Sequence, residues 1–315
     1  MNIVFMGTPD LAAVVLDKLI HSEHKILAAV TQPDKPKGRG NQVQLTPVKE
    51  LALQYKIPVL QPNRVKEEGF LPVLKEINPD IIVVAAFGQI VPKSILELPA
   101  YGCINVHTSL LPKYRGAAPI QWAIIDGEEK TGVTIMYMDA SLDTGDMIMK
   151  AEVPIERKET GGSLHDKLAE CGGNLVLEAL AAIENGTAPR IKQKDEESNY
   201  ARMLDKSTGL IDFNRSAEEI ERLIRGLNPW PSAYTYLDGK TLKIWDAEVI
   251  TAEAAGTPGE ITAVTKDSIL VKTAKGSLAV REVQLEGKKR MSVDAFLRGY
   301  TITPGVILQS NNEQS

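Results

Sequence analysis

Residues 80–88 read DIIVVAAFG, a run of branched apolar residues that ends at a glycine. Successive side chains of a strand point to opposite faces, so a run that is apolar at every position is buried on both faces. Such strands are typical of parallel sheets that are covered by helices on both sides. The stretch therefore predicts a central strand of an α/β sheet.

Strand and helix patterns alternate on both sides of this run. Short strand-like apolar runs lie at residues 2–7, 25–32, 57–62, 103–107 and 132–138. Helical spacing of apolar residues is found at residues 11–20 and 45–55. Strands that alternate with helices at this spacing predict an α/β fold with a Rossmann-like, doubly wound parallel sheet. We place this domain at residues 1–189.

The pattern changes after this domain. Residues 190–207 are polar and have no periodicity, which predicts a linker. An amphipathic helix and several short strands follow, with Asp238-Gly239 as the turn of a hairpin. We therefore expect residues 208–315 to form a smaller, OB-like β-barrel, with a frayed tail from residue 307 onward.

Length, charge and composition narrow the class of protein. A chain of 315 residues suggests about two domains. Its net charge of −5 argues against a surface built for non-specific nucleic-acid binding, although a local basic patch is compatible with it. The two cysteines, Cys103 and Cys171, are far apart and predict reduced thiols rather than metal ligands. No signal peptide or membrane-spanning run is recognisable, so we expect a cytoplasmic protein.

The stretch NVHTSLLPKYRGAAP, residues 105–119, places Asn105 and His107 two positions apart at the end of a predicted strand. Both side chains then point to the same face, and ligands of open α/β sheets bind just outside the carboxyl ends of the strands. An amide beside an imidazole can stabilise an oxyanion and move a proton. A purely structural polar pair that closes the strand explains the same residues equally well.

The loop after the next predicted strand favours the catalytic interpretation. It contains three carboxylates, namely Asp139, Asp143 and Asp146. A carboxylate beside His107 would orient the ring and favour its protonated form. The spacing leaves open which of the three plays this part.

Two basic segments are candidates for contact with a nucleic acid. The glycine-containing loop at residues 31–44 carries Lys35, Lys37 and Arg39. A second cluster in the predicted β-barrel consists of Lys288, Lys289 and Arg290. Both suit a phosphate backbone, and solvated surface loops are the alternative.

The motifs NVHTSLLP and GVTIMYMDASLDTGDM together resemble the folate-dependent formyltransferase family. The segments VFMGTPD, QPDKPKGRG and NPWP are similar to the tRNA-directed members of that family. The resemblance implies that the formyl group of 10-formyltetrahydrofolate passes to the α-amine of methionine carried by initiator tRNA, without a metal. The family's three catalytic positions fall on Asn105, His107 and Asp143.

The same resemblance implies binding sites for both substrates. It assigns tetrahydrofolate binding to Ser109, Leu110, Leu111 and Pro112, and the lining of the pterin pocket to Phe87, Gly88 and Ile90. It assigns the basic loop with Arg39 to the tRNA acceptor end and the β-barrel to tRNA binding. A monomer is the default expectation for a protein of this type.

Four other functions compete with this interpretation. A formyltransferase for a small amine, such as glycinamide ribonucleotide or an amino sugar, would share the catalytic residues, and so would a hydrolase that releases formate. A nicotinamide oxidoreductase would share the fold but needs the G-x-G-x-x-G turn, which is missing after the first strand. A non-catalytic RNA-binding protein would not need Asn105, His107 and Asp143. The extra β-domain and the GRG loop favour tRNA over a small amine.

Overall fold

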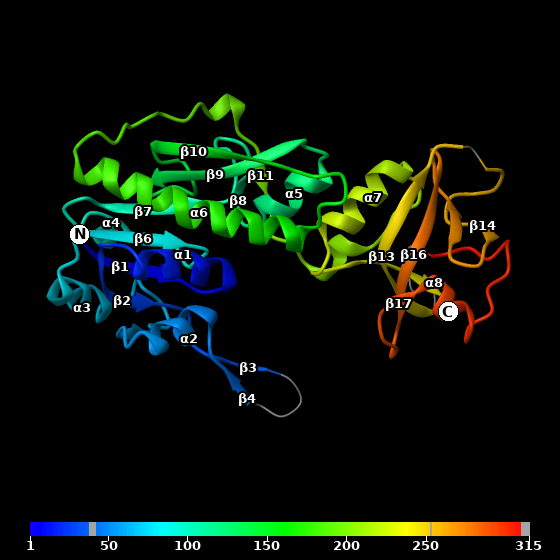
Figure 1. Cartoon of the computed structure of the whole chain (residues 1–315), viewed down its shortest axis with the longest axis horizontal. Helices are drawn as coiled ribbons and strands as arrows, with labels where there is room; N and C mark the ends of the chain where they lie inside the picture. Colours follow the sequence, from blue (N-terminus) through cyan, green and yellow to red (C-terminus); the bar gives the residue numbers. More distant parts are fainter. Residues whose placement is uncertain (38–41, 253, 310–315) are drawn as a thin grey trace. The chain divides into compact units, whose positions relative to one another are not determined.

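The computed structural model describes residues 1–37, 42–252 and 254–309 (Figure 1). The chain forms two compact units, and neither is one continuous segment. Unit 1 consists of Met1–Pro119, Lys130–Pro154 and His165–Ala201. Unit 2 consists of Ile120–Glu129, Ile155–Leu164 and the chain from Arg202 onward. The limits 1–189 and 208–315 for independent domains, with a linker at 190–207, stay a prediction.

Unit 1 is built on a seven-stranded sheet in the order β10-β9-β7-β6-β1-β2-β5. Its strands are β1 (Asn2–Gly7), β2 (Lys25–Val30), β5 (Val59–Leu60), β6 (Ile81–Ala85), β7 (Cys103–His107), β9 (Lys130–Tyr137) and β10 (Met147–Pro154). Five neighbouring strands of this sheet run parallel, namely β7, β6, β1, β2 and β5. Strand β9 is antiparallel to β7, and β10 is antiparallel to β9. The predicted α/β fold is confirmed, with two antiparallel strands added at one edge.

The apolar run at residues 80–88 contains β6, and all five residues of this strand are buried. Unit 1 contains the helices α1 (Asp10–Ile20), α2 (Pro47–Gln54), α3 (Phe70–Ile77) and α4 (Lys93–Leu96) and most of α6 (Gly161–Glu184), whereas α5 (Pro119–Ile125) falls mostly in unit 2. Apolar residues of α3 and α4 share one core cluster with alternate residues of β1, β2 and β6. On the opposite face, Gly172 of α6 lies against Val106 of β7. Helices therefore cover both faces, as the apolar strands require.

Two small ribbons complete unit 1. Strands β3 (Lys35–Lys37) and β4 (Gln42–Gln44) form an antiparallel hairpin in the basic loop. Strands β8 (Arg115–Gly116) and β11 (Tyr200–Ala201) pair in parallel, and a short 3-10 helix, η1 (Asp195–Glu197), precedes β11. The segment that we predicted as a linker thus pairs with the loop that follows β7.

Unit 2 contains a β-sheet in the order β12-β13-β16-β15-β14, with β17 paired to β16. Its elements after residue 202 are η2 (Lys206–Gly209), α7 (Ala217–Gly226), β12 (Ala233–Leu237), β13 (Lys240–Ile250), β14 (Ile261–Val264), β15 (Ile269–Lys272), β16 (Ser277–Leu285), β17 (Met291–Ser292) and α8 (Val293–Leu297). The predicted hairpin turn is confirmed, because Asp238 and Gly239 both have positive φ between β12 and β13.

The end of the described chain closes this sheet. Gln309 exchanges backbone hydrogen bonds with Tyr236 of β12, and Ile307 bridges Glu260 beside β14. The two edge strands of the sheet, β12 and β14, therefore both lie beside residues 307–309, which supports the predicted barrel. The expectation of a frayed tail is wrong for residues 307–309, because pairing removes two exposed edges; residues 310–315 lie outside the described part.

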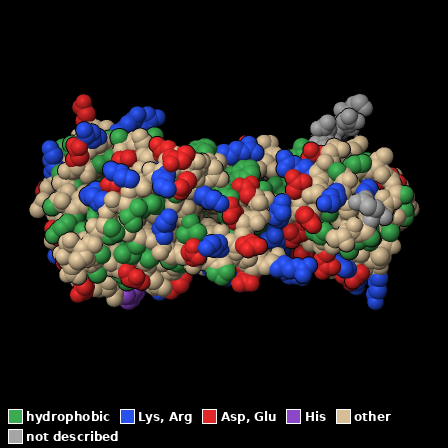
Figure 2. Space-filling model, turned by 90° about the horizontal axis from the view of Figure 1, so that it is seen from above, with side chains coloured by type: hydrophobic (Ala, Val, Ile, Leu, Met, Phe, Trp, Pro, Cys, Tyr) green, Lys and Arg blue, Asp and Glu red, His purple; other side chains and the backbone are tan. Residues whose placement is uncertain are grey.

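One face of the molecule mixes both signs of charge. On the face shown in Figure 2, Lys and Arg side chains lie interspersed with Asp and Glu. Within the described ranges, none of the helices combines the length and the apolar character that a bilayer span requires.

Candidate active site

Asn105 and His107 lie on the same side of β7, as the alternation predicts. Cys103, two residues earlier, contacts the backbone carbonyls of α4, whereas Val106 faces α6. His107 is only 6% exposed and Asn105 is half-buried. In the described part of the chain, nothing hydrogen-bonds the Asn105 side-chain amide. A donor in this state is available to a ligand.

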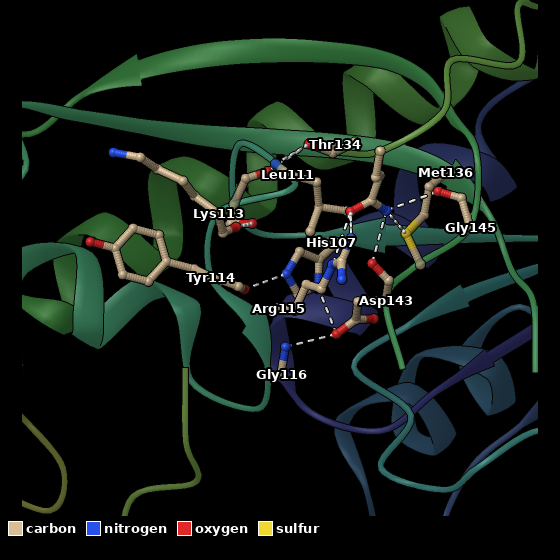
Figure 3. A network of polar contacts seen from close by, with 12 residues as sticks. His107, Leu111, Lys113, Tyr114, Arg115, Gly116, Thr134, Met136, Asp143 and Gly145 are labelled. Carbon is tan, nitrogen blue, oxygen red and sulfur yellow. Dashed lines mark hydrogen bonds and ion pairs between the residues drawn. The ribbon is translucent and has the colours of Figure 1, made fainter. Parts of the chain in front are cut away.

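The tautomer of the neutral His107 ring follows from its hydrogen-bond partner. Nε2 lies 2.8 Å from the carbonyl oxygen of Tyr114 (Figure 3). Because a carbonyl only accepts, Nε2 must carry a hydrogen and donate it. Nδ1 is then the basic nitrogen of the neutral ring, and it lies 3.8 Å from Oδ2 of Asp143.

The structure distinguishes the three loop carboxylates. Asp139 accepts hydrogen bonds within its own loop, from Ser141 and Thr144. Asp146 pairs with Lys192, at 2.9 Å. Asp143 alone among the three is paired with His107.

The Asp143 side chain is held by a hydrogen bond from the short ribbon of β8 and β11. Its Oδ2 accepts a 2.8 Å hydrogen bond from the backbone N–H of Gly116 in β8. Asp143 has a φ of 54°, a left-handed conformation that is uncommon outside glycine. The loop between β9 and β10 begins beside Cys103, the first residue of β7, where the backbone N–H of Met138 donates to the Cys103 carbonyl. By Asp143 the loop has reached His107, the last residue of β7. This course brings the carboxylate to His107.

One residue of this neighbourhood was missed by the sequence analysis. Gln193 contacts both the Asp143 loop and Arg115, which precedes Gly116. It lies in the polar segment that we predicted as a linker. Such a segment has no periodicity, so nothing in its pattern singled out this residue.

The loop after His107 is held by hydrogen bonds on several sides. Thr134 of β9 donates to the Ser109 carbonyl and accepts from the Leu111 N–H. Ser109 donates to the Lys113 carbonyl, and Lys150 donates to the Leu111 carbonyl at 2.8 Å. Ser109 and Leu111 are buried, while Leu110 and Pro112 are partly exposed. The loop is therefore a fixed wall next to the His107–Asp143 pair.

Comparison with known proteins identifies the type of protein that carries this arrangement. A model described as formyl transferase matches residues 1–180, and a model of the formyl transferase C-terminal domain matches residues 203–301. A methionyl-tRNA formyltransferase of Lachnospira eligens is 54% identical over 98% of this chain and 99% of its own length. A methionyl-tRNA formyltransferase of Clostridioides difficile is 53% identical over 98% of this chain and 100% of its own length.

This chain belongs to the methionyl-tRNA formyltransferase family. Among solved structures, an N-formyltransferase from Helicobacter canadensis in complex with folinic acid and dTDP-3-aminofucose has a TM-score of 0.67. It is 19% identical, and the match covers 88% of this chain and 98% of that one. At this identity the likeness establishes the formyltransferase fold.

The second group of predicted folate residues has mixed surroundings in this formyltransferase chain. Phe87 is buried in the core cluster with α3 and α4, and its carbonyl accepts from Gln32. Gly88 has a φ of 78° and its carbonyl also accepts from Gln32. Ile90 is 84% exposed. The backbone at Phe87 and Gly88 is thus fixed, whereas the Ile90 side chain is open to solvent.

The base of the formyltransferase's basic hairpin is held by a polar cluster. Lys49 donates to Asp34 at 2.5 Å and to Gln61 at 2.8 Å. Gln61 donates in turn to Asp34 and to the Gln32 carbonyl. The hydrogen bond from Lys49 is the main reason why the pKa of Asp34 lies below its usual value. These bonds fix the chain just before Lys35.

The predicted tRNA-contacting residues are not equally placed. Lys35 is exposed, Lys37 ends β3, and Arg39 lies outside the described residues. Lys288 and Lys289 are exposed in the turn between β16 and β17, with no ion pair to any described residue. Arg290, by contrast, has an ion-pair partner.

Arg290 is already paired within unit 2. It donates to both carboxylate oxygens of Glu282, at 2.7 and 2.5 Å, and its guanidinium lies 4.6 Å from the centre of the Trp245 ring. A guanidinium in such a bidentate pair has less of its charge available for a phosphate. Lys288 and Lys289 are therefore better placed than Arg290 to contact RNA.

Proposed function

We propose that this chain transfers the formyl group of 10-formyltetrahydrofolate to the α-amine of methionyl-tRNA, the initiator form, giving N-formylmethionyl-tRNA. Its membership in the family supports the choice of substrates. One observation carries the chemistry: the half-buried Asn105 amide has no partner among the described residues and lies two residues before His107 on the same face of β7, where His107 is paired with Asp143.

The first step creates a charge that Asn105 is suited to stabilise. The folate supplies a formyl carbon, and the neutral methionyl amine attacks it to give a tetrahedral oxyanion. Preorganised N–H donors aimed at such an oxygen commonly provide the largest part of rate enhancement. The free amide of Asn105 is the first donor in this scheme. The Nε2–H of His107 already donates to the Tyr114 carbonyl, so His107 becomes a second donor only if this hydrogen is shared between that carbonyl and the oxyanion.

The second requirement is a proton carrier. As the new C–N bond forms and the bond from carbon to N10 breaks, the amine loses one proton and N10 gains one. We assign this transfer to His107, whose Nδ1 is the basic atom of the neutral ring. Asp143 lies beside Nδ1 and stabilises the ring while it holds the proton.

The binding residues follow from the same assignment. We propose that the folate lies against the wall formed by Ser109, Leu110, Leu111 and Pro112, with the pterin near Phe87, Gly88 and Ile90. We propose that Lys35, Lys37 and Arg39 contact the acceptor end of the tRNA. Lys288 and Lys289 contact its backbone, with Arg290 in a lesser part.

The proposed reaction needs no metal, because N–H donors stabilise the oxyanion. In the described part of the chain, no three His, Cys, Asp or Glu residues are grouped as metal ligands. Activity should persist after dialysis against a chelator, and a loss that added metal restores would reject this part. We place the reaction in the cytoplasm, where aminoacylated tRNA is used, and expect a monomer.

A labelling experiment tests the function. The protein is mixed with formyl-labelled 10-formyltetrahydrofolate and then offered charged initiator tRNA or a set of small amines that includes amino sugars. We expect the label on the methionine of the tRNA. Label on an amino sugar would support the alternative function, and label released as formate without either acceptor would indicate a hydrolase.

A further inference from the structure

Gln193 uses its whole side-chain amide to join two segments of the candidate site. Its Nε2 donates to the carbonyls of Asp143 and Gly145, both at 2.8 Å. Its Oε1 accepts from Nε and from a terminal nitrogen of Arg115, at 3.1 and 2.9 Å. The same Arg115 also donates to Asp195, at 2.8 Å.

These partners determine the orientation of the amide. A guanidinium only donates and a carbonyl only accepts, so the oxygen of Gln193 must face Arg115 and its nitrogen must face the loop. Both hydrogens of the nitrogen and both lone pairs of the oxygen are then used. Only an amide of this length has two donors and two acceptors in this geometry, whereas a carboxylate would have none of the donors.

The two joined segments are those that position the catalytic carboxylate. One segment contains Asp143 itself, whose φ of 54° is left-handed. The other contains Gly116, whose N–H holds Oδ2 of Asp143, and which follows Arg115 directly. Asp accepts this conformation more readily than most non-glycine residues, and contacts with neighbouring segments keep it there. Gln193 supplies such a restraint on the backbone of Asp143.

We propose that Gln193 is a positioning residue, which sets the distance between the carboxylate of Asp143 and the ring of His107. The inference rests on the proposed catalytic role of Asp143. Gln193 itself is not expected to touch either substrate. Its replacement should lower kcat, because the carboxylate moves away from Nδ1, and should leave the KM for tRNA nearly unchanged.

Two variants of Gln193 and one control test the proposal. Gln193→Glu keeps the acceptors for Arg115 but turns a charged oxygen toward the carbonyls of Asp143 and Gly145. Gln193→Ala removes both sets of bonds. We expect each to lower kcat by about tenfold to a hundredfold, because a misplacement of about an ångström can cost about a hundredfold. The control, Asp195→Asn, disturbs only the outer partner of Arg115 and should retain most activity.

A double-mutant cycle separates positioning from a general effect on folding. Gln193→Ala is introduced into parent protein and into Asp143→Asn, and single-turnover formylation is measured with both substrates saturating. If Gln193 acts through the carboxylate, Gln193→Ala should lower the formylation rate of the Asp143→Asn protein by less than about threefold, because the charge that Gln193 positions is already gone. Thermal unfolding of all variants confirms that they are folded.

The outcomes are distinguishable. An equal loss in both backgrounds, or full activity of Gln193→Ala and Gln193→Glu, would overturn the positioning role alone. Full activity of Asp143→Asn would overturn the proposed function of that residue and this inference with it. A loss of Gln193→Ala activity that appears only in KM would also overturn the inference.

Discussion

Nδ1 of His107 lies 3.8 Å from Oδ2 of Asp143, and both side chains are nearly buried. The distance exceeds that of a hydrogen bond, so the two groups interact as neighbouring charges whenever the ring is protonated. Since Nε2 is bound to the Tyr114 carbonyl, a proton that the ring takes up goes to the nitrogen that faces the carboxylate. The pair can therefore gain a proton without leaving an uncompensated buried charge.

Removal of the Asn105 amide should impair the chemical step strongly. Asn105→Ala deletes the free donor, and loss of one oxyanion donor commonly lowers kcat about a hundredfold or more. Asn105→Asp keeps the size but replaces the donor by a charged acceptor, so it should be at least as inactive. The measurement is single-turnover formylation of charged initiator tRNA. An Asn105→Ala rate equal to that of the parent would show that another group binds the oxyanion.

Gly116→Ala should displace the donor that holds Asp143. A Cβ at this position would lie 2.5 Å from the ring of Tyr200 and 2.7 Å from the carbonyl oxygen of Ala201, and the glycine has a φ of 110°. The backbone must shift, which moves the Gly116 N–H away from the carboxylate. We expect at least about a tenfold loss of kcat, since an ångström of misplacement can cost about a hundredfold.

Gly186 provides the matched control for this substitution. It also has a positive φ, of 71°, but an added Cβ meets nothing within 4 Å. Gly186→Ala should therefore cost about 1 kcal/mol or more of stability through backbone strain, with kcat unchanged. Comparable kcat losses in the two variants would mean that strain, rather than displacement of the Asp143 donor, explains the effect of Gly116→Ala.

The parts of the fold that were predictable from sequence depend on local patterns. Burial of β6 on both faces leaves an apolar residue at each position, and the Asp238-Gly239 turn requires residues that accept positive φ. The placement of Asn105 and His107 on one face follows from alternation along β7. These features need only a few neighbouring residues, so a single sequence contains them.

The features that escaped prediction depend on contacts between distant segments. Gln193 meets Asp143 across 50 positions of the chain, and its own neighbourhood is polar and aperiodic. Gln309 pairs with Tyr236 although the tail around it looks unstructured in sequence. Arg290 belongs to a basic triplet, yet its pairing with Glu282 becomes visible only when β16 and the following turn are folded.

The basic triplet in unit 2 should contribute unequally to tRNA binding. Each lysine that contacts a phosphate adds roughly one to the slope of log affinity against log salt concentration. The double variant Lys288→Ala with Lys289→Ala should therefore reduce this slope by about two. Arg290→Ala should change it by less than about one, because Glu282 already neutralises that charge. Binding of charged tRNA over a series of KCl concentrations gives the slopes, and a larger effect of Arg290→Ala would contradict the assignment.

The stability of unit 2 should fall at alkaline pH through Tyr300. Its hydroxyl donates to Asp238 at 2.6 Å, and this bond raises the pKa of Tyr300 from 10.0 to about 12. Above pH 10 the unfolded chain loses the phenolic proton while the folded chain keeps it. The stabilisation is thus fully present below pH 10 and is lost as the pH rises toward 12.

Two variants isolate this contribution. Tyr300→Phe removes the titrating group, so its difference in unfolding free energy from the parent should shrink as the pH rises from about 10 to about 12. Asp238→Asn keeps a hydrogen-bond acceptor and suits the positive φ of this turn, but removes the charge that opposes ionisation. It should weaken the pH dependence without abolishing the bond. Tryptophan fluorescence during urea unfolding reports on this unit, because Trp122, Trp230 and Trp245 all belong to it. A difference between Tyr300→Phe and parent that stays constant across this pH range would show that the Asp238 contact does not control the titration.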